Sequence, residues 1–464
     1  MKPAPPGQFR AYASRWWVLT LASLMTALQG GYWNMFGPIA PAVQPLLGWS
    51  VGTIALLNNW GPILFCITLL PSSWLLDTRG LRPSCLLCMG LVVAGAVCRA
   101  ITATGPAATP LMHLGQILNA AAGPVSMSVG PLVSATWFPP EQRTTSTSII
   151  SVLNYGGCAL MFVVGPALVP SRAVALGDDD DGAAATFPDA AARDATAADV
   201  LAYQRWCAAL AALVLLAMFC YFPNKPPTPP SLTATTERTD FRGGLRSLRS
   251  GKRDYWLCCC AYGIVTGFYG SWGSMLAPNL AHVLPRADAE SESGWLGFYG
   301  SVAGCVAGMA CGVYADRFGS MKRIALGNSL AAAAAFLVFG LYCSGALPTS
   351  TGALYASSVL GGLLINSTIP LFFELAVETA YPVAEGLSGG VLALMNNVFC
   401  LLFLLVAMVP GLGTAWMNWA VVAAALIGFG LMVPFREDYK RLRVDQEGQE
   451  AQGNRAPLLL AEDG

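Results

Sequence analysis

Two carboxylates stand in an apolar segment in the C-terminal part of the chain. Glu374 and Glu378 are one helical turn apart at the end of the stretch 353–377. A carboxylate inside a membrane is costly, so it usually relays protons, meets a cation or pairs with a base. Because this stretch holds no basic residue, one hypothesis is that Glu374 carries a coupling proton, with Glu378 as a second acid. The alternative, a structural clamp to Arg317 or Lys322, stays equally open.

Amide and aromatic side chains in the middle of other apolar segments are candidates to bind a solute. They are Gln29, Trp33, Asn34, Asn154, Tyr155, Tyr262, Tyr269, Asn396 and Asn397. Aromatic faces attract cations or stack on rings, and amides hydrogen-bond without adding charge. This chemistry suits a flat or cationic small organic molecule. Tyr and Trp also anchor helices at the membrane interface, and Asn also joins helices, so Tyr262 fits either role. Asn34 could instead cap a helix that breaks before Pro38.

The composition requires lipid around much of the chain. Hydrophobic residues make up 55% of the 464 residues and charged residues only 11%, against about 25% charged in soluble domains. With a formal net charge of zero and no basic block, a nucleic-acid partner is not expected. No metal-ligand cluster, nucleophile–base pair or phosphate loop appears, so we expect no cofactor and no enzyme. The pairs Gly156–Gly157, Gly361–Gly362 and Gly389–Gly390 instead predict close helix contacts.

Apolar segments long enough to span a bilayer occur twelve times, in two sets of six. The first set is 16–37, 51–75, 83–104, 110–136, 145–169 and 201–222, and the second is 255–277, 294–315, 324–345, 353–377, 386–410 and 416–434. Counted from a cytoplasmic N-terminus, most of the 26 basic residues fall on the cytoplasmic face. The other face receives only Arg99, Arg172, Arg193, Arg205 and Arg286. This asymmetry predicts that both termini are cytoplasmic.

The segments predict an all-α membrane protein of two six-helix bundles. The expected parts are a tail 1–15, a bundle 16–222, a cytoplasmic linker 223–253, a bundle 254–434 and a cytoplasmic tail 435–464. The loop 171–199, with its acidic run Asp178 to Asp181, is expected to be non-cytoplasmic and disordered.

A short motif occurs once in each half, after the second span and after the eighth. The first copy contains Asp77, Gly80 and Arg82, and the second contains Gly312, Asp316, Arg317 and Gly319. Each places an Asp at a helix end, a Gly three residues later, and basic residues near it. An Asp at a neighbouring helix N-terminus is favoured by the helix dipole, and Gly permits a tight turn. Its repetition predicts two parallel repeats, with the motif as a gate clamp rather than a static loop cap.

This repeated motif resembles that of the major facilitator superfamily. The first copy departs from the usual form, because Thr78 stands where Arg is common and Ser73 where the leading Gly would fall. Longer strings resemble solute carrier family 49, the haem and choline branch. These strings are Gln29 to Asn34, Gly37 to Ile39, Trp60 to Ile63, Trp74 to Asp77, Thr136 to Phe138, Tyr262 to Ile264, Pro370 to Leu375 and Glu378 to Gly386.

The resemblance implies a monomeric major facilitator fold that moves a small organic solute together with protons. Members have been linked to haem, to choline or ethanolamine, and to proton-driven movement of pyridoxine, vitamin B6, across the lysosomal membrane. In related members, residues that match Trp33, Tyr155, Tyr269 and Asn397 line the pocket. The resemblance favours the lysosomal membrane, with the plasma membrane as the alternative. The tail string Leu458-Leu459-Leu460 is similar to part of a dileucine sorting signal.

A non-transporting receptor or scaffold remains the rival class. A scaffold has no need to switch conformation, so the second copy of the gating motif argues for a transporter that alternates between two states.

Overall fold

The secondary-structure elements of the described residues are helices. The computed structural model describes residues 10–173, 186–234, 241–250, 252–280, 286–348, 350–407, 409 and 412–453. Within them lie seventeen α-helices and one short 3-10 helix. The helices of the first half are α1 Ser14–Trp33, α2 Ala40–Leu47, α3 Val51–Arg79, α4 Leu81–Arg99, α5 Ala108–Ala121, α6 Gly123–Trp137, η1 Pro140–Gln142, α7 Arg143–Leu168 and α8 Ala190–Cys220. Those that follow are α9 Phe241–Arg249, α10 Arg253–Ser274, α11 Leu276–Leu280, α12 Arg286–Phe318, α13 Met321–Cys343, α14 Thr351–Ala380, α15 Glu385–Ala407, α16 Ala415–Met432 and α17 Lys440–Gly453.

Ten helical segments of the described chain are long and apolar enough to cross a membrane. They include every expected span except the first and the seventh, which correspond to α1 and α10. These two helices have 20 and 22 residues but a more polar composition, rich in Ser, Thr, Gly and, in α1, Gln. The chain is therefore a multi-pass membrane protein, and the count of twelve spans stays a prediction.

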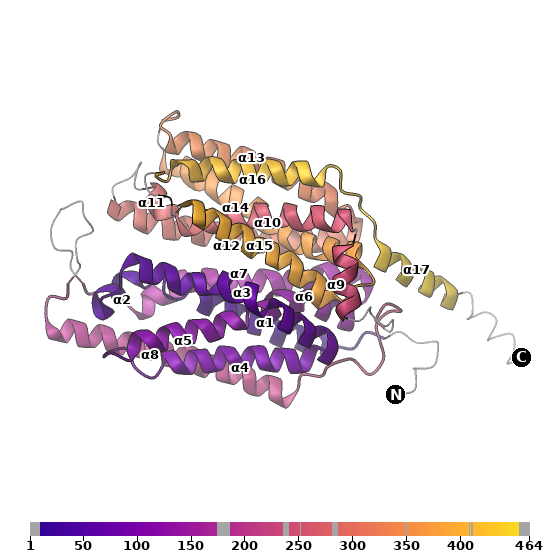
Figure 1. The fold of residues 1–464 in the computed structure, drawn as a ribbon, viewed down its shortest axis with the longest axis horizontal. Coiled ribbons are helices and arrows are strands. Elements are labelled where there is room, and N and C mark those ends of the chain that lie inside the picture. The colour runs from indigo at the N-terminus through magenta and orange to yellow at the C-terminus, as the bar shows by residue number, and fades with distance from the viewer. Residues whose placement is uncertain are drawn as a thin grey trace, which may run out of the picture.

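The long helices form two bundles that lie side by side (Figure 1). Helices α1 to α8 make the N-terminal bundle and α10 to α16 the C-terminal bundle. Contacts between the bundles join α7 to α12 and α14, and join α3 and α6 to α15. One apolar cluster of the C-terminal bundle also takes in Phe65 and Leu69 of α3, so the bundles share part of their core.

Glycine allows α1 and α7 to touch along their backbones. A Cβ added at Gly157 would lie 1.9 Å from the carbonyl oxygen of Ala27. A Cβ at Gly361 would lie 2.6 Å from the Phe336 ring, and one at Gly390 would lie 2.8 Å from Ser73 Oγ. The prediction that the glycine pairs mark close helix contacts is confirmed at these positions.

Two element boundaries differ from the sequence-based expectation. Helix α1 ends at Trp33 rather than at residue 37, with Asn34 as its C-cap residue. Helix α8 starts at Ala190, because the Asp189 side chain accepts a hydrogen bond from Ala192 N at 2.6 Å and caps the first turn. The prediction that 171–199 is disordered is therefore wrong for residues 190–199, which form the first turns of α8. The acidic run Asp178 to Asp181 and the string Leu458-Leu459-Leu460 lie outside the described residues.

Both described ends of the chain lie at the same end of the bundles, beside the segment that links them. Arg10 N donates to Pro229 O at 3.2 Å, and the Tyr12 and Thr228 hydroxyls are 2.9 Å apart. The linker contains α9 and the polar tail contains α17, both drawn at this end in Figure 1. We call this end, which holds residues 223–234, α9 and α17, the linker end.

Candidate functional site

Asp316, at the end of α12, binds the first turn of α7 in the opposite bundle. Its Oδ1 accepts from Thr144 N at 2.9 Å, and its Oδ2 accepts from Thr145 N at 2.7 Å and Thr145 Oγ1 at 2.6 Å. A carboxylate at a helix N-terminus is stabilised by unpaired amides and by the helix dipole. The second copy of the motif therefore joins the two bundles directly.

Asp77, at the end of α3, makes the corresponding contact in the other direction. Its Oδ1 accepts from Gly386 N at 3.0 Å, in the first turn of α15. A Cβ on Gly386 would lie 2.4 Å from Asp77 Oδ1, so a larger residue there would force the carboxylate to move. The Asp at the end of α3 thus binds the first turn of α15, and the Asp at the end of α12 binds the first turn of α7. We call these two contacts the paired Asp contacts.

The other motif residues have different tasks. Gly312 faces α7, where a Cβ would lie 2.0 Å from Ser148 Oγ, so it too lies between the bundles. Gly80 and Gly319 have positive φ values of 83° and 67°, which end α3 and α12 in turns that favour glycine. Arg82 stays within its own bundle, where Nη2 donates to Phe219 O at 3.2 Å near the end of α8. Arg317 is exposed and lies over the Phe318 ring.

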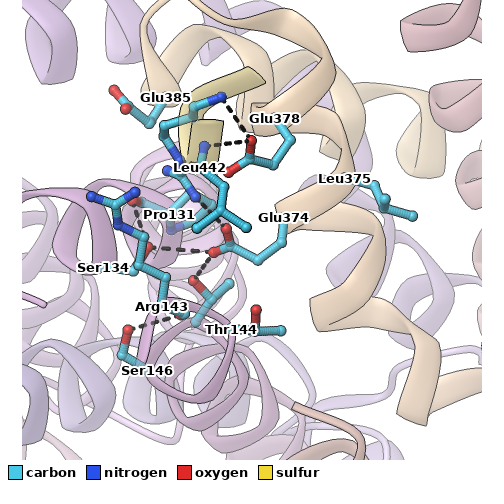
Figure 2. Close-up of polar contacts among 12 residues, drawn as sticks. Pro131, Ser134, Arg143, Thr144, Ser146, Glu374, Leu375, Glu378, Glu385 and Leu442 are labelled. Atoms are coloured by element: carbon cyan, nitrogen blue, oxygen red, sulfur yellow. Dashed lines mark hydrogen bonds and ion pairs between the residues drawn. The ribbon is translucent and has the colours of Figure 1, made fainter. Parts of the chain in front are cut away.

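Glu374 lies buried between the bundles at the linker end, with 1% of its surface exposed. Its Oε1 accepts from Thr147 Oγ1 at 2.5 Å and from Ser134 Oγ at 3.4 Å, both in the N-terminal bundle. Its Oε2 accepts from Arg441 Nη2 of α17 at 2.6 Å. Figure 2 shows the Glu374 side chain pointing toward Ser134, with Glu378 one turn along α14. The carboxylate is thus shared by three parts of the chain.

Glu378 also binds α17. Its Oε1 accepts from Arg441 Nε at 2.9 Å, and its Oε2 from Arg441 N at 2.9 Å and Leu442 N at 3.3 Å. Burial disfavours the charge on Arg441, but the carboxylates of Glu378 and Glu374 outweigh burial and raise the pKa of this guanidinium. The clamp partner predicted for Glu374, Arg317 or Lys322, is wrong: Lys322 Nζ donates to Val433 O and Phe435 O instead.

A second buried ion pair lies one turn further along α17. Asp445 Oδ2 is 2.7 Å from Arg143 Nη1, and these side chains are 1% and 3% exposed. Arg143 Nη2 also donates to Ser231 Oγ and Thr233 Oγ1 of the linker. A cavity of about 260 Å³ lies between this pair, Glu374 and Asp316. The linker end therefore combines the paired Asp contacts with a buried charge cluster.

The predicted amides of the N-terminal bundle join helices to one another. Gln29 Nε2 donates to Asn119 O at 3.2 Å, and Asn119 Nδ2 returns a bond to Gln29 O at 3.0 Å. Asn154 Nδ2 donates to Thr26 O at 2.8 Å. These contacts satisfy part of their hydrogen-bonding capacity within the bundle.

Trp33 and Asn34 lie where α1 ends. Trp33 Nε1 donates to Asn58 O at 2.8 Å, and Asn34 Nδ2 lies 3.4 Å from Cys158 O. Both side chains are half-buried. The alternative that Asn34 caps α1 is confirmed by its C-cap position, and this leaves a solute-binding role for its side chain as a prediction.

Tyr155 and Tyr262 are the two candidates that the fold brings to one place. Tyr155 packs against the apolar cluster that contains Tyr262, although they come from different bundles. Tyr262 is fully buried against Phe372 and Phe373. Tyr155 also lines a cavity of about 10 Å³ with Asn366, room for about one water.

The remaining candidates lie within the C-terminal bundle. Tyr269 stacks on Trp272, with ring centroids 6.1 Å apart. Asn396 Nδ2 donates to Thr266 Oγ1 at 2.7 Å, and Asn397 Nδ2 donates to Ala393 O at 2.9 Å. Of the nine candidates, Tyr155 lines the cavity of about 10 Å³ described above.

Sequence reasoning missed the residues that hold Glu374 and Arg143. A run of hydroxyl side chains, Thr144 to Ser148, was a usable signal, because it follows Pro139–Pro140 and begins a helix. Ser134 carried no such signal. Arg441 and Asp445 stand in a polar tail whose composition predicts solvent rather than burial.

Comparison with known proteins agrees with this geometry. Residues 22–407 match the family model of the Major Facilitator Superfamily. The chain is 37% identical to the Solute carrier family 49 member 4 homolog of Xenopus laevis, over 96% of this chain and 95% of that protein. It is 26% identical to the Choline/ethanolamine transporter flvcr2b of Danio rerio, over 95% and 88% of the two chains. The crystal structure of the transporter FucP in the outward conformation matches with a TM-score of 0.67 at 14% identity, over 89% and 97%.

Proposed function

The chain belongs to the solute carrier family 49 branch of the major facilitator superfamily, and on that premise we propose that it moves a small organic solute across a membrane by proton-coupled alternating access. Pyridoxine is the favoured solute by family resemblance. Choline or ethanolamine is the second candidate, because relatives at 26% identity carry that name, and haem is the third.

The paired Asp contacts carry this proposal. Asp77 and Asp316 each bind a helix N-terminus of the other bundle, so the bundles are held together at the linker end by polar contacts rather than by apolar packing alone. Such contacts can break and re-form as a unit when the bundles rock, whereas a closely packed core resists separation. A scaffold would not need two reciprocal contacts of this kind.

Aromatic and amide side chains support a flat, uncharged or cationic solute. Trp33, Tyr155, Tyr269 and Asn397 match pocket positions of related members. In this conformation Trp33 and Asn397 are hydrogen-bonded to backbone carbonyls and Tyr269 is stacked on Trp272, so we expect solute binding to rearrange these side chains as the bundles move. A twelve-helix, monomeric chain with the linker end in the cytoplasm accounts for the basic residues there. The lysosomal membrane is the proposed site, with the plasma membrane as the alternative.

Glu374 is the proposed proton carrier. Glu374 accepts hydrogen bonds from Ser134 and Thr147 of the N-terminal bundle and from Arg441 beside the C-terminal bundle. Its negative charge therefore stabilises the closed linker end, in which all three contacts are made. Protonation would weaken its ion pair with Arg441 and favour opening of this end.

Uptake by the purified full chain in proteoliposomes tests the function. We expect saturable uptake of pyridoxine that rises with an imposed proton gradient, and competition with choline, ethanolamine and haem ranks the alternatives. Absence of uptake for all four compounds, with the protein folded, would favour a receptor or scaffold.

The Glu374→Gln variant tests the coupling. We expect uptake that no longer depends on the proton gradient, while Glu141→Gln, an exposed carboxyl at the same end, keeps the wild-type dependence. An unchanged gradient dependence in Glu374→Gln would remove the coupling role.

A further inference from the structure

Helix α17 is attached to the C-terminal bundle by its first turn. Arg441, 1% exposed, binds both carboxylates of α14 through Nη2 and Nε at 2.6 and 2.9 Å. The segment before α17 is also held there, because Lys322 Nζ donates to Val433 O at 2.9 Å and to Phe435 O at 2.6 Å. The start of this helix therefore moves with the C-terminal bundle.

The next turn of α17 is attached to the N-terminal bundle. Asp445 binds Arg143 of α7 at 2.7 Å, and it accepts from Thr233 N and Thr233 Oγ1, each at 2.7 Å. Arg143 begins α7 of the N-terminal bundle, and Thr233 lies in the linker that follows this bundle. Separation of the bundles at the linker end must therefore break the contacts of Asp445 or detach α17 from α14.

Charge, rather than apolar burial, holds α17 in place. Its sequence from Lys440 to Gly453 offers Leu442 and Val444 as its larger apolar side chains, and both are only half-buried. A cavity of about 260 Å³ borders the helix. Each of these ion pairs is also a hydrogen bond, which depends on distance and angle, so the hydrogen-bonded part of the attachment is lost once the partners separate.

We propose that α17 is a latch of the transport cycle, in which the Asp445–Arg143 pair holds the linker end closed and releases it when the bundles separate. This inference rests on the proposed alternating access and adds Asp445 and Arg143 as positioning residues. Removal of one partner leaves the other as an uncompensated buried charge, which strongly disfavours the closed arrangement.

Hydrogen exchange of three amides measures this closure without any substrate. Thr144 N and Thr145 N are bound by Asp316, and Gly386 N is bound by Asp77, so all three are released when the linker end opens. None of them bonds α17. In purified full-length Asp445→Asn, we expect peptides that contain these amides to exchange more than tenfold faster than in the wild type.

The matched control is Arg443→Gln on the same helix. Arg443 is 61% exposed and pairs only with Asp438 of the adjoining segment, among the contacts described. We expect wild-type exchange in this variant. Peptides from residues 332–343 of α13, which come after the first turns that contact the segment before α17, report folding, and they should be unchanged in both variants.

Arg143→Gln tests the same pair from the other bundle. We expect it to accelerate the three reporter amides to a similar extent, and the double variant with Asp445→Asn to exceed neither single variant by more than about twofold. Unchanged reporter amides in Asp445→Asn, with α13 protected, would overturn the latch, as would equal acceleration in Arg443→Gln. Hydrogen exchange tests the latch without any substrate, whereas uptake in proteoliposomes tests the proposed function, so failure of one can be told from failure of the other.

Discussion

The two paired Asp contacts occupy equivalent places but differ in strength. Asp316 accepts three hydrogen bonds at 2.6 to 2.9 Å from Thr144 and Thr145. Asp77 accepts one at 3.0 Å from Gly386, and its Oδ2 is buried without a hydrogen-bond partner in the described part of the chain. The repeat is therefore symmetric in position and asymmetric in its hydrogen bonds.

The receiving helix causes much of this difference. Helix α7 begins with hydroxyl side chains, so Thr145 adds a side-chain donor to its backbone amide. Helix α15 begins with Glu385-Gly386-Leu387, which brings a further carboxylate and no hydroxyl. The motif alone therefore does not set the strength of the contact.

The largest effect is expected for Asp316→Ala. The change removes three bonds to a charged acceptor, which should disfavour the closed linker end by about 3 to 4 kcal/mol, since such bonds contribute about 1.5–3 kcal/mol each and are not additive. Exchange of the Gly386 amide, which keeps its Asp77 acceptor in this variant, measures the shift. Thr145→Val, which removes one of the three bonds, should reach about a third of it. Equal effects of Asp316→Ala and Asp77→Ala would contradict the prediction that the Asp316 contact is the stronger of the two.

Gly386→Ala should have an intermediate effect. Its new Cβ would lie 2.4 Å from Asp77 Oδ1, so the carboxylate must move and α15 must shift from α3. Overpacking of this kind costs about 1–3 kcal/mol. Thermal unfolding of the purified protein, compared with Gly430→Ala, where nothing lies within 4 Å of the added Cβ, isolates the close contact. A wild-type midpoint in Gly386→Ala would show that α15 adjusts freely.

Asp77→Ala should have a smaller effect than either. One hydrogen bond to a charged acceptor is lost, at about 1.5–3 kcal/mol, and a buried oxygen without a partner in the described part of the chain is removed at the same time, which offsets part of that loss. Uptake, and exchange of the Thr144 and Thr145 amides, which keep Asp316 as acceptor, should change by less than about tenfold. A larger loss than that of Asp316→Ala would reverse the ranking of the two contacts.

The smallest effect is expected for Thr78→Arg, which restores the residue common in the superfamily. Thr78 is exposed, and a surface ion pair is worth about 0–1 kcal/mol. Exchange at Gly386 should slow by less than about fivefold. A much stronger stabilisation would assign the weakness of the first contact to the motif rather than to the receiving helix.

Local signals were enough to predict the helices and the repeat. Apolar length located the ten helical segments that could cross a membrane. The two Asp-Gly spacings predicted carboxylates at helix N-termini, which the structure confirms for Asp77 and Asp316. The same local reasoning failed over 190–199, because an Ala-rich polar stretch resembles a disordered loop until Asp189 caps it as a helix.

Composition and spacing by themselves determined that this chain crosses a membrane as two repeated helical halves, because hydropathy and short motifs are properties of neighbouring residues. Only the tertiary structure decided that Glu374 pairs with Arg441, and Arg143 with Asp445. Arg441 and Asp445 come from a polar tail. Charged residues in such a tail predict contact with solvent and do not indicate which residues of the bundles lie near them. Their burial depends on two bundles meeting at one end, and this is a property of the whole fold.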